Sequence, residues 1–443
     1  MAMAYTGKWN STDQIPWNEY KKGLISRWGS MDTSSGASAS RYSLSGEWRQ
    51  SDQSGTLTTQ AYLIQNSLDL YSNFEYATSS QFNQADGRVS SGVNIARTWN
   101  LEGIGKEAVN TLGVQLQNDN IFNGLYNTER RVRSGTVRQD HITQSSVGIY
   151  GENHVHWNDW LRTVAGVRGD YFRFANVGQN FVANTDTVSD FMATPKLNVV
   201  FGPWQKTEYY YSIGNGFHSN DARGVTISPG FLGSTRRSQG LVRTFGQEVG
   251  VRTEILSGLQ STLALFQLDN DSEIVYIGDE GKTEDSGRRS RRTGWEFNNY
   301  YKPNDWLTID ADLAYSRARF RDAGGGGNYI EGAVEGVASL AAVVDNGGAY
   351  NGSLQLRYFG PRPLKEDNSV RSDGTTTLNG RLGYKISKET RIELLGFNLL
   401  DSQQSAIDYY NDSYTFASAS KLSGRVFHPI ESRNFRLMLI TRF

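Results

Sequence analysis

The amino-acid sequence predicts an all-β fold, a transmembrane antiparallel β-barrel, and three observations carry that prediction. Segments in which apolar and polar residues alternate recur along the whole chain of 443 residues, as expected of strands with one apolar and one polar face. No run of about 18 or more apolar residues occurs, which excludes helical membrane spans. Short and long connections follow each other in strict alternation, as they do in bacterial membrane barrels.

The alternating segments define the strands. In the last one, 435–443, one face carries Phe and Leu side chains, and the other carries Arg436 and Arg442. Segments 307–315 and 353–358 divide in the same way. Around Leu268, one face carries the acid and amide groups of Gln267, Asp269, Asp271 and Glu273, and we expect this row to face the lumen. Such strands suit lipid on one side and water on the other.

The connections favour a membrane barrel over a soluble sandwich. Eight tight turns are expected, at 52–55, near Gly103, and at 158–159, 203–205, 257–258, 303–305, 346–348 and 387–389. Nine long polar loops lie between them, near 11–39, 73–86, 124–139, 175–187, 218–240, 276–288, 320–332, 361–374 and 400–426. Because a sandwich has no reason to put every long loop at one end, we predict a barrel of about 18 strands.

Tryptophans gather beside the tight turns. Trp157 and Trp160 flank one of these turns, Trp204 lies at a second and Trp306 at a third. Tryptophan favours the membrane interface because its ring is apolar while its N–H group needs a partner. We interpret these residues as a periplasmic girdle; the alternative is that they cap small cores near the turns.

Bulk composition excludes several classes of protein. The formal net charge of -1 gives no nucleic-acid-binding footprint, and the absence of Cys excludes disulfides and thiolate metal sites. A mean hydropathy of -0.54 is compatible with a membrane barrel, since half of each strand is polar. The first residues show no basic and then apolar leader, so we expect no signal peptide and a single barrel domain over residues 1–443.

Several segments resemble the barrels of TonB-dependent outer-membrane receptors. They are AGVRGD at 165–170, GNGFHSNDARG at 214–224, RRSRRTGWE at 288–296, LRYFGPRPL at 356–364, FNLLD at 397–401 and the closing RNFRLMLITRF at 433–443. The resemblance runs from about residue 5 to the end. It implies a bacterial outer-membrane protein, and it implies that the terminal Phe443 is part of the signal read by the barrel assembly machinery.

The resemblance also implies partners that the sequence does not display. Complete members of the family have a TonB box, a plug domain inside the lumen and 22 strands. With about 18 strands here, we expect the plug and the first four strands to be missing, and both termini to lie on the periplasmic side. Contact with the TonB complex would then depend on the missing N-terminal plug. The other expected partners are outer-membrane lipid and a small ligand, with the protein acting as a monomer.

Candidate ligand-binding residues cluster in two long loops. His218, Asn220, Asp221 and Arg223 follow a strand that should rise to the cell surface; the alternative, which we favour, is that they form the loop's own hydrogen-bond network. A second set, Arg130, Arg131 and Arg133, could attract an anionic ferric chelate. For all these arginines the alternative is pairing with nearby carboxylates.

Other polar clusters are weaker candidates. His154 and His156 would share a strand face, yet a closed metal site wants about four ligands, so a structural role is the better interpretation. Arginines 288, 289, 291 and 292 could steer anions, but we expect them to pair with Asp269, Asp271 and Glu273. We expect no metal site, no cofactor and no enzymatic activity, because no catalytic motif stands in a workable context.

The sequence therefore indicates outer-membrane transport of a scarce nutrient, with a ferric siderophore as the expected ligand, through the resemblance to TonB-dependent receptors. Two alternatives remain open at this stage. The chain could form a passive, porin-like pore, or it could be a truncated barrel fragment without function of its own. An outer-membrane hydrolase would need a Ser, His and acid set at the lumen mouth, and no such set can be assembled.

Overall fold

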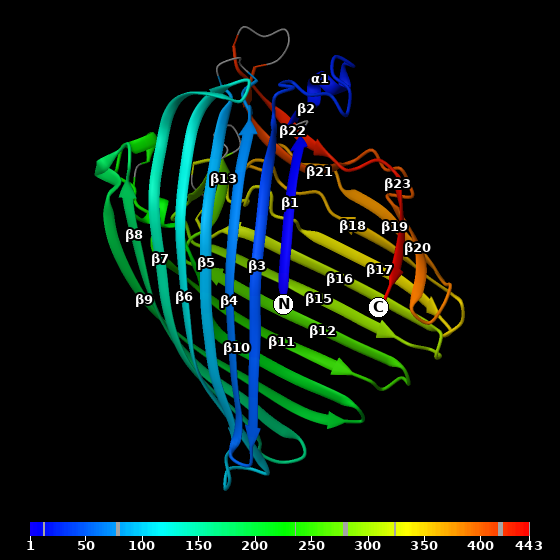
Figure 1. Ribbon diagram of the computed structural model, residues 1–443. Coiled ribbons are helices and arrows are strands. Elements are labelled where there is room, and N and C mark those ends of the chain that lie inside the picture. The colour runs from blue at the N-terminus through cyan, green and yellow to red at the C-terminus, as the bar shows by residue number, and fades with distance from the viewer. Residues whose placement is uncertain are drawn as a thin grey trace.

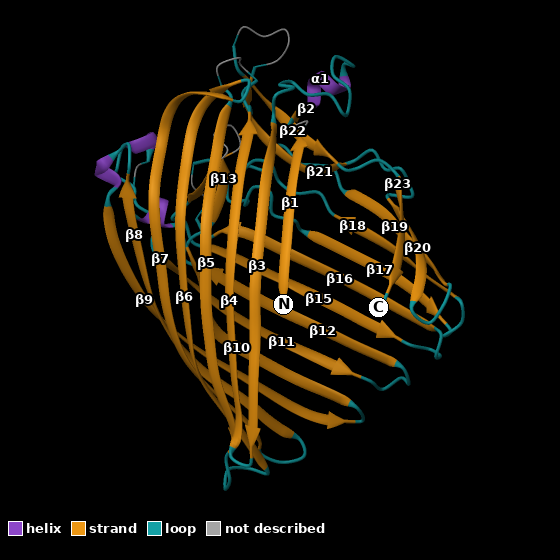
Figure 2. Cartoon of the chain, viewed as in Figure 1, coloured by secondary structure: helices purple, strands orange, loops and turns teal. Residues whose placement is uncertain are grey.

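Strands dominate the structure, a computed structural model that describes residues 1–11, 14–76, 80–234, 236–277, 282–322, 325–414 and 420–442. Figure 1 shows one large, strongly curved sheet, and Figure 2 shows how few helical turns accompany it. That sheet holds 18 antiparallel strands. Among the described residues no helix has the length and apolar character needed to cross a membrane. The predicted fold class and strand number are confirmed.

The 18 strands of the large sheet follow the chain in order. They are β1 (Ala2–Asn10), β3 (Gly36–Asp52), β4 (Gly55–Ser72), β5 (Phe82–Asn100), β6 (Glu107–Glu129), β7 (Val132–His156), β8 (Leu161–Gly178), β9 (Asp186–Trp204), β10 (Thr207–Ser219), β11 (Leu241–Thr253), β12 (Leu259–Asn270), β15 (Ser290–Tyr301), β16 (Leu307–Phe320), β17 (Gly336–Asp345), β18 (Tyr350–Phe359), β19 (Thr375–Lys385), β20 (Thr390–Phe397) and β23 (Asn434–Thr441).

The remaining elements lie in the long connections. They are β2 (Ile15–Pro16), α1 (Trp17–Lys21), the 3-10 turns Val182–Asn184 and Phe231–Gly233, α2 (Ala222–Val225), β13 (Ile274–Ile277), β14 (Lys282–Asp285), β21 (Ser405–Ser413) and β22 (Leu422–Pro429). β13 pairs with β14, and β21 pairs with β22. The expected loops 276–288 and 400–426 thus contain short hairpins.

Each strand of the large sheet pairs with its neighbour in chain order, from β1 with β3 to β20 with β23. Within the described ranges no register joins β1 to β23, so these two strands form the edges of the sheet. Thr441 lies beside Thr390 at the short-turn end, as expected of a periplasmic terminus. Ala2 lies beside Leu44, part-way along β3, and the expectation that the N-terminus reaches that end is wrong.

All eight predicted tight turns connect strands of the sheet, and they lie at the end opposite the long connections. One of the nine predicted loops is wrong. Residues 124–139 form the continuation of β6 and the start of β7, which meet at a turn of Arg130 and Arg131, with φ angles of 50° and 69°. Polarity misled the prediction here, because few residues of this segment are apolar and because register shifts at Leu125–Tyr126 and Asn127–Thr128 interrupt the alternation.

The two faces of the sheet differ as the alternation predicts. Leucines at alternate positions of a strand are exposed on the outer side of the sheet. Examples are Leu354, which is 54% exposed, and Leu437, which is 73% exposed. Among the described residues, buried apolar side chains form three small clusters near the long connections instead of one central core. An exposed apolar outer band is stable in lipid and would be costly in water.

The girdle tryptophans lie where the sequence places them. Trp157, Trp160, Trp204 and Trp306 stand at the short-turn end and are all about half exposed, from 45% to 49%. Trp160 stacks on Trp204 with ring centres 6.4 Å apart. Because these rings are exposed, they do not cap buried cores, and their position supports the interfacial interpretation.

The expected lumen-facing row around Leu268 is wrong in part. Asp269 shares its parity with the exposed residues Leu263 and Leu265 of β12, so its side chain belongs to the outer face. Asp271 and Glu273 follow the end of β12, and Glu273 is buried. Periodicity grouped the acidic residues correctly, but it could not reveal which face of this strand turns outward.

The first and last long connections meet at the upper rim, and we call this contact the rim clasp, formed by residues 14–28, 401–414 and 420–433. β2 pairs with β22, bringing Ile15 beside Phe427. The Phe427 ring, fully buried, lies 5.4 Å from the ring centres of Trp17 and Tyr20. The clasp thus joins the two ends of the sheet at the rim, although β1 and β23 share no hydrogen-bonded register.

Candidate functional site

The connection 220–240, between β10 and β11, begins with a segment, residues 220–228, that folds against the inner wall of the sheet. Ala222 and Val225 of α2 are buried against Ile121, Ile142 and Phe174. Those three wall residues have the opposite parity to the exposed residues Leu116, Val147 and Tyr171 of the same strands, so they face inward. Burial of this apolar patch holds the start of the connection close to β6, β7 and β8.

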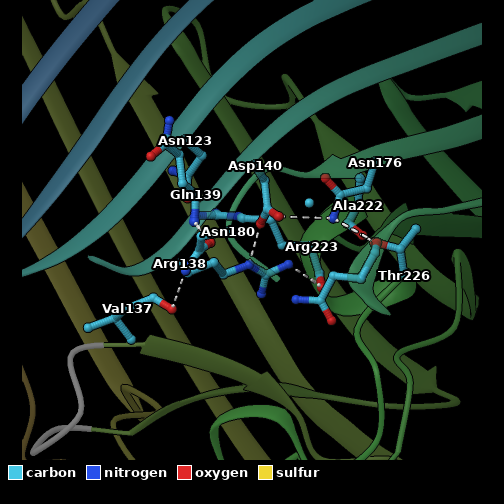
Figure 3. Close-up of polar contacts among 12 residues, drawn as sticks. Asn123, Val137, Arg138, Gln139, Asp140, Asn176, Asn180, Ala222, Arg223 and Thr226 are labelled. Atoms are coloured by element: carbon cyan, nitrogen blue, oxygen red, sulfur yellow. Dashed lines mark hydrogen bonds and ion pairs between the residues drawn. The ribbon is translucent and has the colours of Figure 1, made fainter. Parts of the chain in front are cut away.

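Polar contacts fix the same segment to the wall (Figure 3). The Arg138 guanidinium pairs with the Asp140 carboxylate and donates to the carbonyl oxygen of Arg223 at 3.1 Å. The Asn176 side-chain nitrogen donates to the Thr226 hydroxyl at 3.2 Å. Arg138, Asp140 and Asn176 are buried, so each of these groups needs its partner.

Asp221 and Arg223 form a local ion pair at the front of this segment. Both nitrogen contacts from the Arg223 guanidinium to the Asp221 carboxylate measure 2.8 Å, and the Arg223 backbone N–H also donates to that carboxylate at 2.8 Å. The barrel wall around the pair raises the pKa of Asp221, but Arg223 outweighs that effect and holds this pKa below its usual value.

A second pair of the same kind faces it from β5. Arg88 donates twice to Asp86, at 3.0 Å each. Burial lowers the pKa of Arg223, but attraction to Asp221, Asp86 and Asp140 outweighs it and raises that pKa. Charges of both signs therefore lie together on the inner wall, below the long connections.

His218 and Asn220 stand beside this cluster. Asn220 is buried and closes the base of the connection, donating from its side chain to the Gln239 carbonyl at 2.8 Å. His218 pairs with Val242 across β10 and β11, and its buried Nε2 atom has no hydrogen-bond partner among the described residues. Of these predicted residues, His218 thus keeps an unused polar atom, while the groups of Asn220 serve the loop itself.

The second predicted set is held at the β6–β7 turn. Arg131 donates to the Ser34 carbonyl at 2.6 Å and to the Asn10 side chain at 2.9 Å. Arg133 donates to Asn83 at 2.8 Å, and its guanidinium carbon lies 3.8 Å from the centre of the Tyr126 ring. Arg130 is exposed at the turn. Arg131 and Arg133 therefore brace the first long connection and the strand ends.

The structure does not unite the two predicted sets. Among the described contacts, none joins residues 130–133 to residues 218–223. Sequence reasoning missed Asp86, Arg88, Arg138 and Asp140. A signal was present, because acid and arginine two residues apart recur along the strands, as in Arg168 and Asp170, joined at 2.6 Å, and such residues share a face.

The other arginine cluster follows the predicted pairing. Arg291 contacts Asp269 at 2.7 Å, Arg289 contacts Asp271 at 3.3 Å, and Arg292 contacts Glu273 at 2.9 Å. Arg288 pairs with Asp322 at 2.8 Å and with Glu366 at 2.6 Å. These charges are therefore balanced locally.

His154 of the predicted histidine pair contacts a carboxylate on its own strand. His154 Nε2 lies 2.7 Å from the Glu152 carboxylate, which also contacts Lys196 at 2.5 Å. No group of three or more potential ligands for a metal ion is found within the described ranges. The inner-wall arrangement offers guanidinium, carboxylate, amide and imidazole groups for hydrogen bonds to a polar ligand.

Comparison with known proteins identifies the family. The family model described as "TonB dependent receptor-like, beta-barrel" matches residues 3–399, and no curated protein sequence matches. Among solved structures, the ferric-catecholate import receptor Fiu from K12 E. coli is 14% identical to this chain, with a TM-score of 0.72. The match covers 100% of this chain and 71% of the Fiu chain.

Two further solved structures show the same fold. The ferric citrate transporter FecA is 17% identical to this chain, with a TM-score of 0.75, and the match covers 99% of this chain and 66% of the FecA chain. The ferric yersiniabactin uptake receptor FyuA from Yersinia pestis is 14% identical to this chain, with a TM-score of 0.72, and the match covers 100% of this chain and 67% of the FyuA chain. The chain thus spans about two thirds of the length of these relatives, which are transporters and receptors. It belongs to the TonB-dependent receptors and is an outer-membrane β-barrel protein.

Proposed function

We propose that this chain forms the barrel wall and cell-surface connections of a transporter that takes up a ferric siderophore with energy supplied through TonB. The observation that carries the proposal is the inner-wall cluster, where connection 220–240 is fixed beside the charged pairs of β5 and β7. A rigid polar surface below the cell-surface connections is suited to hold a polar chelate. The ferric ligands named for Fiu, FecA and FyuA support iron as the cargo.

Residues 1–443 act in this proposal as a single barrel domain, and TonB acts through a plug. Within the cluster, we assign ligand contact to His218, Asp221 and Arg223, because His218 has an unused buried nitrogen and the other two remain partly open to solvent. Asn220 positions the connection. Arg130 is assigned to the attraction of an anionic chelate at the rim, and Arg131 and Arg133 support it.

Binding can be tested on the purified whole chain through quenching of its 10 Trp residues. The probes are a ferric catecholate, ferric citrate and the same chelators without iron. We expect one ferric chelate to bind, and Arg223→Gln and His218→Ala each to weaken its affinity about tenfold, the loss of one good hydrogen bond to a charged group. Arg97→Gln, at the short-turn end of β5, is the matched control.

Two results would contradict the proposal. One is equal binding of the chelators with and without iron. The other is a stable conductance in planar bilayers that no ferric chelate blocks, which would indicate a passive pore. Uptake of radioactive iron by cells with and without TonB then tests the energised step separately.

A further inference from the structure

The outer face of β15 and β16 changes abruptly in character above the apolar band. Trp295 pairs with Tyr315, and both side chains lie on the exposed outer side. The next outward pair along the strands is Thr293 with Arg317, and the one after that is Arg291 with Arg319. Two aromatic rings of the kind found at membrane interfaces are thus followed immediately by arginines on the same face.

Positive charge is in excess in this region, which we call the arginine face. It comprises five arginines and two carboxylates of β12, β15, β16 and the residues next to these strands: Arg289, Arg291, Arg317, Arg319, Arg321, Asp269 and Asp271. Glu335 is shared by Arg319, at 3.1 Å, and Arg371. Arg317 is exposed and makes no ion pair with any described residue. An excess of three positive charges therefore stands just above the aromatic pair.

The outward residues of β6 to β9, on the opposite side of the sheet, are mostly uncharged. There, outward residues of adjacent strands pair through hydroxyl and amide groups, such as Asn118 with Ser145 at 2.8 Å and Tyr171 with Ser189 at 2.9 Å. Arg173 is the lone arginine beside them on the outer face of β8. The arginine face is therefore a local feature of β12, β15, β16 and the residues next to them. The outward residues of β6 to β9 form no comparable group of arginines.

We propose that the arginine face binds the phosphate groups of a lipid headgroup in the outer leaflet of the membrane. The long connections of bacterial barrels are extracellular, which places the face at the level of that leaflet's headgroups. Arginine suits phosphate because its planar guanidinium can donate two parallel hydrogen bonds. The apolar strand surface below receives the acyl chains, so one lipid contacts both regions.

The side chains of the arginine face point away from the lumen, so a ligand in the lumen cannot reach them. Arg291 and Arg317 share parity with the lipid-facing residues Leu265 and Leu313 through the strand registers. A chelate held at the inner-wall cluster lies on the other side of the sheet. The inference therefore stands independently of the proposed transport function.

The whole chain can be tested in nanodiscs of phosphatidylcholine with a small fraction of fluorescent lipid A, which carries phosphates. Energy transfer from the protein's tryptophans reports lipid held at its surface. We expect enrichment of lipid A over a fluorescent phosphatidylcholine, reduced about fivefold for each of Arg317→Gln and Arg321→Gln, since each basic group near a charged membrane contributes on the order of 1 kcal/mol. Arg317→Lys should restore part of the binding.

Arg173→Gln is the matched control, because it removes one exposed outward arginine from β8, outside the arginine face. The inference is overturned if Arg173→Gln reduces lipid A binding as much as Arg317→Gln does. It is also overturned if phosphatidylcholine is retained equally, or if millimolar inorganic phosphate abolishes the enrichment at constant ionic strength, which would indicate a site for soluble anions. Far-ultraviolet circular dichroism of each variant confirms that the barrel is folded.

Discussion

The guanidinium carbon of Arg425 lies 4.0 Å from the centre of the Trp17 ring, although the two residues belong to the last and first long connections of the chain. Arg425 also donates to Asp408 at 2.8 Å and to Asp373 at 2.9 Å. Asp408 is almost fully buried. One side chain therefore joins three cell-surface segments, and the rim clasp depends on it.

Replacing Arg425 by Gln should open the rim clasp. The change removes the cation–π contact, worth roughly 1 to 2 kcal/mol when desolvated, and leaves the buried Asp408 carboxylate with Arg362 at 3.8 Å as its remaining ion pair. Breaking a buried pair costs about 3 kcal/mol or more. We expect faster amide hydrogen exchange in β2 and β22, measured by mass spectrometry, with the exchange of β6 and β7 unchanged.

Arg433→Gln is the matched control for that experiment. Arg433 contacts Asp401 at 3.7 Å, and both side chains are nearly half exposed, so their interaction is worth less than about 1 kcal/mol. If Arg433→Gln accelerates exchange in β22 as much as Arg425→Gln does, the importance assigned to the Arg425 stack is wrong.

Replacing Arg138 by Met should release connection 220–240 from the inner wall. Met keeps much of the side-chain length but leaves the buried Asp140 carboxylate without its arginine, a change that costs about 3 to 5 kcal/mol. We expect faster amide exchange at residues 222–226 and weaker binding of any chelate. Arg88→Met is the comparison, because its partner Asp86 is partly exposed; equal effects would contradict the role given to burial.

Much of the fold could be predicted because lipid imposes a simple rule on each strand. The exposed outer leucines, the eight tight turns and the exposed tryptophans follow from alternation and local turn chemistry. The loop predicted at 124–139 failed because few of its residues are apolar and because register shifts between β6 and β7 interrupt the alternation. Phe443, expected to engage the assembly machinery, lies outside the described residues.

The candidate site was less accessible to sequence reasoning. The segment containing Asp221 and Arg223 could be recognised, but its partners Arg138 and Asn176 come from strands 40 or more positions away in the chain. Which wall residues meet a connection depends on the number of strands between them and on the way the connection bends. The rim clasp was missed for the same reason, because the residues next to Trp17 in the sequence give no indication that Arg425 contacts it.

Acidification should loosen the front of connection 220–240 through Asp221. The pKa of this carboxyl is held below its usual value, mainly by Arg223 after burial has been overcome. Its stabilising effect is therefore fully present above about pH 4, the pKa of an unfolded Asp, and is lost as the pH falls through the lower folded value. Because the side chain is partly exposed, the effect is less than about 1 kcal/mol.

The comparison of the unchanged protein with Asp221→Asn isolates this effect. At pH 7 the amides of residues 222–226 should exchange more slowly in the unchanged protein than in the variant. That difference should shrink as the pH falls below about 4, the pKa of an unfolded Asp, and it should vanish once the Asp221 carboxyl is protonated. A difference that does not shrink as the pH falls, or that is absent at pH 7, would show that the charge of Asp221 does not hold this segment.

Two glycines with nearly identical φ angles should respond very differently to substitution by alanine. Gly258 has a φ of +75°, and a Cβ atom placed there would lie 2.2 Å from the Lys302 carbonyl oxygen. Gly347 has a φ of +76°, and a Cβ atom there would meet nothing within 4 Å. Both changes cost roughly 1 to 2 kcal/mol for the left-handed conformation, but only Gly258→Ala must also displace backbone.

Gly258 also accepts a hydrogen bond from the Lys302 backbone N–H at 2.7 Å, so displacement there would disturb the turn that leads into β12 and the neighbouring end of β15. We therefore expect Gly258→Ala to lower the free energy of unfolding by at least about 1 kcal/mol more than Gly347→Ala, measured in urea after refolding into detergent. Equal losses would mean that this turn yields at no cost, and that the close approach of residues 258 and 302 is not part of what fixes the strand register there.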